Sequence, residues 1–299
     1  MQHYSISHVT AFNYSYPVVV SHHSAVLKPR DSNEQKCHRF DLDISPRTSD
    51  IIERTDFFGN KSQLFSIQEP HDRLVVESKS IVSTNKPQQK LEDLTISCKD
   101  IRLSLTSPLR NMVSDEQQFV YPTPITPDHE AVQTFGNRFF TDTTPIGTGL
   151  LKILEAFKNE FKFDSTATDV HTPIIESLEK KRGVCQDFAH LLIAAARANG
   201  LSAQYCSGYI LTTPAEGQPR LIGADASHAW VAIHVPDIGW VQIDPTNNQS
   251  CNDQYILVAT GRDYSDVTML KGAVTGGGKH SVDVGVTMLP IDDVPPEAK

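Results

Sequence analysis

Polar residues alternate with β-branched and aromatic residues along the first third of the chain. The pattern covers residues 4–12 and 74–82, and a shorter stretch of the same kind follows at 94–98. Asp56-Phe57-Phe58-Gly59-Asn60 has the composition of a tight turn between two strands. Alternation with a period of two, broken by turns, is typical of antiparallel strands. We therefore expect residues 1 to about 110 to form a β-rich, sandwich-like domain.

Helical periodicity follows in the middle of the chain. From about Thr148, apolar residues recur on one helical face, at Leu150, Leu151, Ile153, Leu154, Phe157 and Phe161. A shorter helix is predicted at 173–180, where Pro173 suits the first turn. A third helix contains Cys185, and its apolar positions are Phe188, Leu191, Leu192 and Ala195. Asn199-Gly200 predicts where this helix ends.

Alternation returns beyond this helix, which predicts strands at 204–211, 228–235 and 239–244. The tail contains Gly276-Gly277-Gly278 and then alternates again at 282–286, so one or two further strands are expected there. The whole chain is therefore predicted to be of the α+β class.

Four prolines mark the change from strands to helices, at Pro108, Pro122, Pro124 and Pro127. Such a stretch is typical of a domain boundary. We expect a β-rich domain at 1–110, a catalytic core at 111–260 and C-terminal strands at 261–299. A return of these last strands to the first domain is one arrangement of the tail.

Composition narrows the class of protein. A chain of 299 residues with 39% hydrophobic residues can bury a sizeable core. The formal net charge of −9 and the pI of about 5.7 argue against nucleic acid as a partner. No run approaches 18 apolar residues, so no membrane span is expected, and the N-terminus lacks the pattern of a secretory signal.

The five cysteines stand far apart, without the spacing of paired metal ligands. They indicate a reduced, cytoplasmic protein without a disulfide framework, and they argue against a structural zinc site. Neither a metal nor another cofactor is expected.

Cys185 is the first candidate for chemistry. It opens its predicted helix, where unpaired backbone N–H groups favour a negative charge on the thiol. The preceding cations, Lys180-Lys181-Arg182, are expected to act in the same direction. Asp187 would oppose them at close range, but a carboxylate in the first turn more often caps the helix. A buried structural cysteine is the alternative interpretation.

His228 and Asp244 are the candidates for the base and for the carboxylate that orients it. They lie on consecutive predicted strands, and they share one face of the sheet if an odd number of residues connects the strands. Opposite or diagonal positions would then let the carboxylate hold the imidazole tautomer. Cys185, His228 and Asp244 together are the set required for nucleophilic acyl transfer.

Other polar and aromatic residues have weaker claims. The backbone N–H of Cys185 is the expected first donor to an oxyanion, and Gln186 is either a second donor or a solvated helix residue. Trp230 and Trp240 fall on the proposed active face, although strand packing explains them equally well. Structural roles are expected for His190, His234, Cys206 and Cys251.

Three motifs resemble the transglutaminase-like superfamily of papain-like fold. They are Gly183-Val184-Cys185-Gln186-Asp187-Phe188, His228-Ala229-Trp230-Val231 and Gly239-Trp240-Val241-Gln242-Ile243-Asp244-Pro245-Thr246. The order of cysteine, histidine and aspartate is also that of the family. Outside this core, the segments that look like bacterial members are His8-Val9-Thr10, Tyr16-Pro17-Val18, Leu27-Lys28-Pro29-Arg30, Asp56–Asn60 and Gly261-Arg262-Asp263-Tyr264.

The resemblance implies a helix bearing Cys185 packed on an antiparallel sheet, and a bacterial transglutaminase-like N-terminal domain. It implies Cys185 as nucleophile, His228 as base and Asp244 as orienting residue. The superfamily includes protein cross-linking enzymes, deamidases, peptidases and peptide-amidases, all of which pass through a thioester. The expected substrate is therefore a peptide or protein with a peptide or glutamine-type amide group, and the acceptor is an amine or water. The oligomeric state is not indicated.

Two other functions are compatible with the sequence. A non-catalytic protein-binding module could keep the fold and use its β-rich domain as a docking surface. A metal protein using Cys185 and His228 is weaker, because two ligands do not complete a zinc site.

Overall fold

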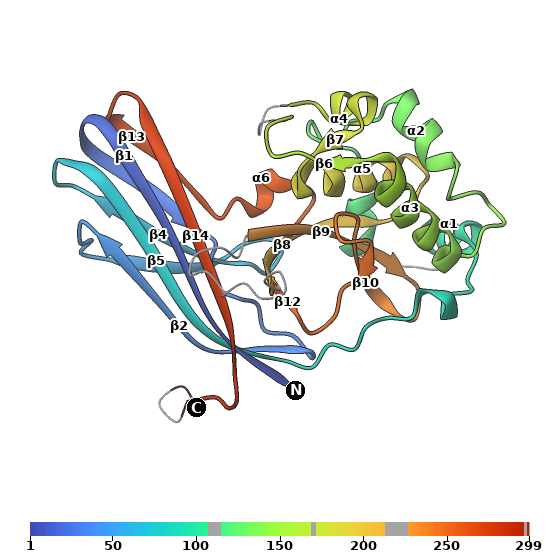
Figure 1. The fold of residues 1–299 in the computed structure, drawn as a ribbon, viewed down its shortest axis with the longest axis horizontal. Coiled ribbons are helices and arrows are strands. Elements are labelled where there is room, and N and C mark those ends of the chain that lie inside the picture. Colours follow the sequence, from blue (N-terminus) through green and yellow to red (C-terminus); the bar gives the residue numbers. More distant parts are fainter. Residues whose placement is uncertain (107–114, 169–171, 213–226, 296–297, 299) are drawn as a thin grey trace, which may run out of the picture.

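The computed structural model describes residues 1–106, 115–168, 172–212, 227–295 and 298. Two antiparallel sheets lie side by side, and helices cover the second of them (Figure 1). This mixed arrangement confirms the predicted α+β class. Within the described ranges, no helix combines the length and the apolar character needed to cross a bilayer.

The first sheet has seven strands in the order β2-β5-β1-β4-β3, and β13 and β14 also pair with β1. The first half of β1, up to Tyr14, lies between β5 and β14, whereas the part after Val18 lies between β4 and β13. The chain ends therefore meet in one sheet. The strands are β1 (Gln2–Ala25), β2 (Gln35–Ser45), β3 (Ile51–Thr55), β4 (Lys61–Ile67), β5 (His71–Thr84), β13 (Leu270–Gly276) and β14 (His280–Ile291).

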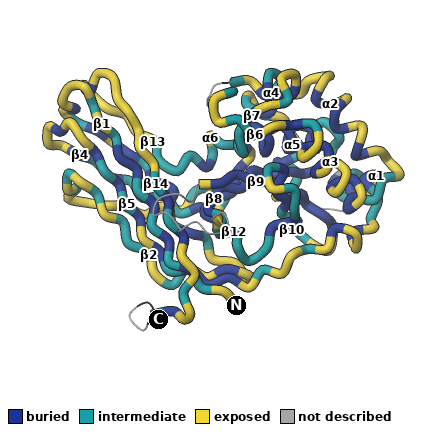
Figure 2. The backbone as a smooth tube through the Cα atoms, viewed as in Figure 1, coloured by how far each residue is buried: buried dark blue, intermediate teal, exposed yellow. Residues whose placement is uncertain are grey.

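The second sheet has five strands in the order β11-β10-β9-β8-β12. They are β8 (Ala203–Ile210), β9 (Ser227–Val235), β10 (Gly239–Asp244), β11 (Gln249–Ser250) and β12 (Tyr255–Gly261). Helix α5 (Cys185–Ala198) packs against β8 and β9 through apolar side chains. Figure 2 shows these central strands as largely buried. The predicted helix with Cys185, packed on an antiparallel sheet, is confirmed.

Shorter elements surround this core. They are η1 (Leu91–Asp93), α1 (Cys98–Thr106), η2 (Asp115–Val120), α2 (Glu130–Asn137), α3 (Ile146–Glu160), β6 (Lys162–Phe163), α4 (Ile174–Lys180), β7 (Arg182–Gly183) and α6 (Tyr264–Val267). Pro173 precedes the first residue of α4, close to its predicted place. The domain boundary expected near residue 110 lies outside the described residues, as does Pro108.

The strand predicted at 94–98 is wrong. Helix α1 begins at Cys98, and Ser97 Oγ accepts a hydrogen bond from the backbone N–H of Asp100. Cys98, Ile101 and Leu105 are buried, which is a helical spacing that extends beyond the short apolar stretch. The serine cap and this longer period outweigh the local β-propensity.

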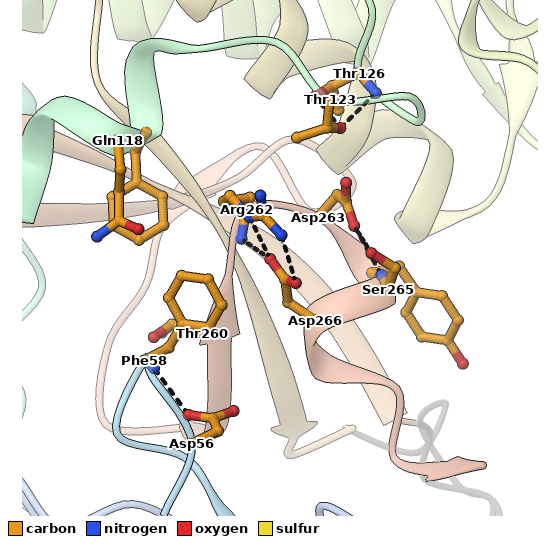
Figure 3. Close-up of polar contacts among 12 residues, drawn as sticks. Asp56, Phe58, Gln118, Thr123, Thr126, Thr260, Arg262, Asp263, Ser265 and Asp266 are labelled. Atoms are coloured by element: carbon orange, nitrogen blue, oxygen red, sulfur yellow. Dashed lines mark hydrogen bonds and ion pairs between the residues drawn. The ribbon is translucent and has the colours of Figure 1, made fainter. Parts of the chain in front are cut away.

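The predicted turn at Asp56–Asn60 joins the two sheets. Asp56 Oδ1 accepts a hydrogen bond from the backbone N–H of Phe58 at 2.9 Å (Figure 3). It accepts a second one from the backbone N–H of Asn60 at 2.8 Å. The buried Asn60 side chain bonds to both backbone groups of Thr260 on β12, at 2.8 and 2.9 Å. Arg30 donates to Asn60 and to Thr260 Oγ1 as well. We call Arg30, Asn60 and Thr260 the latch.

Candidate active site

Cys185 is half-buried at the first position of α5. Asp187 caps this helix, as predicted, because its Oδ2 accepts hydrogen bonds from the Val184 backbone N–H at 2.8 Å and from Thr168 Oγ1 at 2.6 Å. A Cβ on Gly183 would lie 2.6 Å from the same oxygen, so only glycine leaves room for the cap. Phe188 anchors the helix on phenylalanines of the core. The thiol is therefore held in a fixed place at the helix start.

The three cations that precede Cys185 are each paired with a carboxylate. Lys180 pairs with Glu176, one turn earlier on α4. Lys181 lies 3.6 Å from Glu160, and Arg182 lies 3.5 Å from Asp164. Each charge is compensated by a neighbouring carboxylate.

The β9–β10 hairpin brings His228 and Asp244 together. Three residues, 236–238, connect the strands, which is the odd number that the shared face requires. Val235 pairs with Gly239, so His228 and Asp244 are diagonal neighbours. Nε2 of His228 lies 2.7 Å from Oδ2 of Asp244. The predicted same-face arrangement is confirmed.

Asp244 is fully buried and surrounded by donors. Its Oδ2 accepts hydrogen bonds from Tyr255 Oη and Asn247 Nδ2, both at 2.7 Å, in addition to that from His228. Its Oδ1 accepts from the backbone N–H groups of Thr246 and Asn247. Burial acts to raise the pKa of Asp244, but these donors outweigh it and lower the pKa. The carboxylate is therefore ionised and fixed in orientation.

Nε2 of His228 is hydrogen-bonded to Asp244, and the imidazole lines the same cleft as the Cys185 thiol. Burial acts to lower the pKa of His228, but its interactions with Asp244 and Cys185 raise it to about 10. The protonated imidazolium is therefore stabilised between the carboxylate and the thiol. This is the arrangement of an activated cysteine.

Tyr255 and Gln249 also stabilise the Asp244–His228 pair, although nothing in the sequence pattern around them predicts this role. Gln249 Nε2 donates to Tyr255 Oη at 2.8 Å, and Tyr255 donates in turn to Asp244. Of the residues that hold Asp244, only Asn247 could be suspected from the sequence, because a polar side chain three residues after a carboxylate can hydrogen-bond to it.

The two tryptophans have different environments. Trp230 stacks on His228, with ring centroids 6.2 Å apart, and its Nε1 donates to Gln242 at 2.8 Å. Trp240 lies away from the thiol, between Phe119 and His234. Trp230 thus belongs to the site, whereas Trp240 packs against a part of the sheet that lies away from the thiol.

A cleft of about 240 Å³ opens at Cys185 and His228. Gln186 also lines it, so the suggested second oxyanion donor lies next to the thiol. The far wall comes from the first sheet and includes Phe12. The two sheets therefore enclose the site together.

The segment after β12 places Tyr264 in this cleft. Asp263 caps α6 by accepting from the backbone N–H and hydroxyl of Ser265, and Arg262 pairs with Asp266 at 2.9 Å (Figure 3). The backbone N–H of Tyr264 donates to His190 Nε2 at 3.1 Å. Burial lowers the pKa of His190 to about 4, so this histidine is a neutral structural acceptor, as expected.

The remaining thiols lack such surroundings. Cys206 and Cys251 are buried beneath the sheet, and burial raises the pKa of Cys206 to about 12. All five cysteines are free. Among the described residues, no three histidine, cysteine or carboxylate side chains are placed to hold a metal ion.

Comparison with known proteins identifies the family. Residues 4–83 match the bacterial transglutaminase-like N-terminal region, and residues 133–245, which include Cys185, His228 and Asp244, match the transglutaminase-like superfamily. An uncharacterised protein of Mycobacterium tuberculosis is 35% identical over 295 residues, which cover 97% of this chain and 93% of that protein. The chain belongs to the transglutaminase-like superfamily.

Two further proteins are similar to this chain over nearly its whole length. An uncharacterised protein of Mycobacterium leprae is 29% identical over 286 residues, covering 94% of this chain and 96% of the relative. The crystal structure of a candidate cysteine protease from Cytophaga hutchinsonii superimposes with a TM-score of 0.75. It is 19% identical, and the match covers 99% of this chain and 93% of that one, which shows the common fold. The recognition of the family and of its fold from the sequence is confirmed.

Proposed function

We propose that this protein is a thiol-dependent acyltransferase or hydrolase that acts on peptide or amide carbonyl groups. Cys185 is the nucleophile, His228 the general base and acid, and Asp244 the residue that orients the imidazole. The observation that carries the proposal is the buried hydrogen bond between His228 and Asp244, 2.7 Å long, with the imidazole and the Cys185 thiol lining the same cleft. Tyr255 and Asn247 hold the buried carboxylate of Asp244 in place against His228.

The reaction begins when the Cys185 thiolate attacks the carbonyl carbon and forms a tetrahedral intermediate. Its oxyanion is stabilised by the backbone N–H of Cys185, with Gln186 as the second donor. The intermediate collapses to a thioester as the amine or ammonia leaves with the proton of the His228 imidazolium. Water or an amine then attacks the thioester and gives a proton to His228, and Cys185 is released as thiolate.

The acceptor decides the product. Water gives hydrolysis, so the enzyme acts as a peptidase or deamidase, whereas an amine gives a new amide and thus cross-linking. Every step uses only thiol, imidazole, carboxylate and amide groups of this chain. Five free cysteines agree with a cytoplasmic location, which we include in the proposal, together with a peptide or protein as partner.

Alkylation of Cys185 tests the activated thiol. We expect iodoacetamide to modify Cys185 rapidly at about pH 6, and peptide mass spectrometry to locate the label there. His228→Ala should slow this labelling by at least about tenfold, because the thiolate loses its counter-ion. Cys37, which is also partly exposed, is an internal control, since burial raises its pKa to about 11.

Slow labelling that is spread over several cysteines would contradict the proposal. It would favour instead the non-catalytic binding module. Metal bound in stoichiometric amount to Cys185 and His228 after purification would support the metal protein.

A further inference from the structure

The wall of the cleft opposite the thiol is built from the first sheet and the segment that leads back to it. Phe12 on β1 pairs across the strands with Val282 on β14, and Val284, two residues further along β14, lies on the same face. Met269 and Leu270 continue this surface. We call these five residues the apolar wall. In Figure 1, α6 lies between the first sheet and α5, next to this place.

Polar groups near the apolar wall already form hydrogen bonds with other residues of the protein. His8 Nδ1 lies 3.0 Å from Tyr209 Oη, and its Nε2 lies 3.1 Å from Thr10 Oγ1. Burial lowers the pKa of His8 to about 4, so this ring is neutral near pH 7. Among the described residues that line the cleft there is no lysine, arginine, aspartate or glutamate. Apart from the Cys185–His228 pair, whose charges oppose each other, a charged ligand group would therefore lose water without gaining an ionic partner.

The size of the cleft limits what it can hold. Its volume of about 240 Å³ is below the range of roughly 300–1,000 Å³ for sites that enclose drug-sized molecules. One amino-acid side chain with its carbonyl group is of the right order. Val282 and Val284 are 46% and 55% exposed, which is a large apolar surface to leave in water beside a nucleophile.

We propose that the apolar wall binds an uncharged, apolar side chain of the acyl donor, next to the carbonyl that Cys185 attacks. The first sheet thus selects the substrate, and the catalytic residues come from the second. This inference rests on the proposed function of Cys185.

Covalent probes of different charge test the selectivity without knowledge of the natural substrate. N-acetylated leucine, lysine and glutamate chloromethyl ketones alkylate a thiolate, which displaces chloride and forms a thioether. We expect the leucine probe to label Cys185 at least about tenfold faster than either charged probe. Iodoacetamide, which carries no side chain, serves as the reference for intrinsic thiol reactivity.

Two valine variants locate the effect. Relative to iodoacetamide, Val284→Asp should slow the leucine probe by about tenfold and accelerate the lysine probe. Val274→Asp introduces the same charge at an exposed valine of β13 that does not line the cleft, so it should change none of the rates. Both sites are exposed, so both variants should fold, which circular dichroism checks.

The outcomes separate the two claims. Equal rates for the three ketones, with rapid iodoacetamide labelling of Cys185, would overturn the apolar wall and leave the proposed function standing. Identical behaviour of Val284→Asp and Val274→Asp towards the ketones would overturn the apolar wall as well. Slow labelling of Cys185 by iodoacetamide and by all three ketones would remove the proposed function and the inference with it.

Discussion

At the scale of single residues, the site depends on a charged pair kept out of water. The pKa of His228 is raised from 6.5 to about 10 in the folded protein, because Asp244 and Cys185 stabilise the imidazolium. A raised pKa stabilises the fold fully below pH 6.5, and this contribution is lost as the pH rises through about 10. The pair therefore links stability to pH in the alkaline range.

Thermal unfolding across that range tests the link. The melting temperature should fall between about pH 6.5 and 10, and Asp244→Asn should remove much of this slope, because an amide cannot hold the imidazolium. Asp237→Asn is the matched control, since this aspartate lies in the β9–β10 turn with a φ of 64° that asparagine also adopts. Parallel curves for wild type and Asp244→Asn would contradict the assigned pair.

Tyr255 is a positioning residue, because it acts on the imidazole through Asp244. Its hydroxyl helps to lower the pKa of that carboxyl, and a lowered pKa gives stability that is lost as the pH falls through it. Tyr255→Phe should therefore move acid unfolding to higher pH and cost about 1–3 kcal/mol of the free energy of unfolding.

Tyr209→Phe is the control for this variant. Its hydroxyl is also buried, but it bonds to the neutral His8 instead of a carboxylate. This variant should lose stability with a smaller shift of the acid midpoint than Tyr255→Phe shows. Circular dichroism as a function of pH measures both quantities, and equal midpoints for the two variants would refute the role of Tyr255.

At the scale of elements, the start of α5 decides where the thiol lies. Gly183→Ala would push a methyl group against the carboxylate of Asp187, so the helix cap must move. We expect a loss of about 1–3 kcal/mol in unfolding free energy and slower alkylation of Cys185. Gly239→Ala, where a Cβ meets nothing within 4 Å, strains only a backbone with a φ of 95° and should leave alkylation unchanged.

The elements that carry the site were largely predictable from the sequence. Local sequence pattern predicts the helical period of α5, the strand at 228–235 and the short hairpin loop. The odd number of residues in that loop then places His228 and Asp244 on one face of the sheet. The roles of Tyr255 and Gln249 could not be predicted in this way. The position of a tyrosine on an alternating strand does not indicate whether its hydroxyl contacts a carboxylate on another strand. The partners of Lys180-Lys181-Arg182 were missed for the same reason.

At the scale of the whole molecule, the two sheets form one functional unit. The latch fixes β12 against the turn at Asp56–Asn60, and β14 brings the end of the chain to the cleft. The pairing of β13 and β14 with β1 joins segments from opposite ends of the sequence, so no local pattern specifies it. The division at residues 110 and 260 stays a prediction.

Asn60 is the central residue of the latch and is fully buried. Asn60→Ala removes hydrogen bonds to Thr260 and leaves the Arg30 guanidinium short of an acceptor, which should cost about 3 kcal/mol. Asn13→Ala, which removes an exposed bond to Asp283, should change stability by less than about 0.5 kcal/mol. Urea denaturation compares the two, and similar losses would show that the latch is unimportant.

The central claim is that Cys185 carries the acyl group during turnover. The most direct measurement is the reaction with N-acetyl-leucine p-nitrophenyl ester, followed by release of nitrophenolate and by mass spectrometry of the protein. We predict a burst of about one nitrophenolate per chain, an acetyl-leucyl group on Cys185 that hydroxylamine removes, and no burst in His228→Ala. Ester cleavage without an acyl group on Cys185, or equal acylation of Cys185 in His228→Ala, would contradict the account.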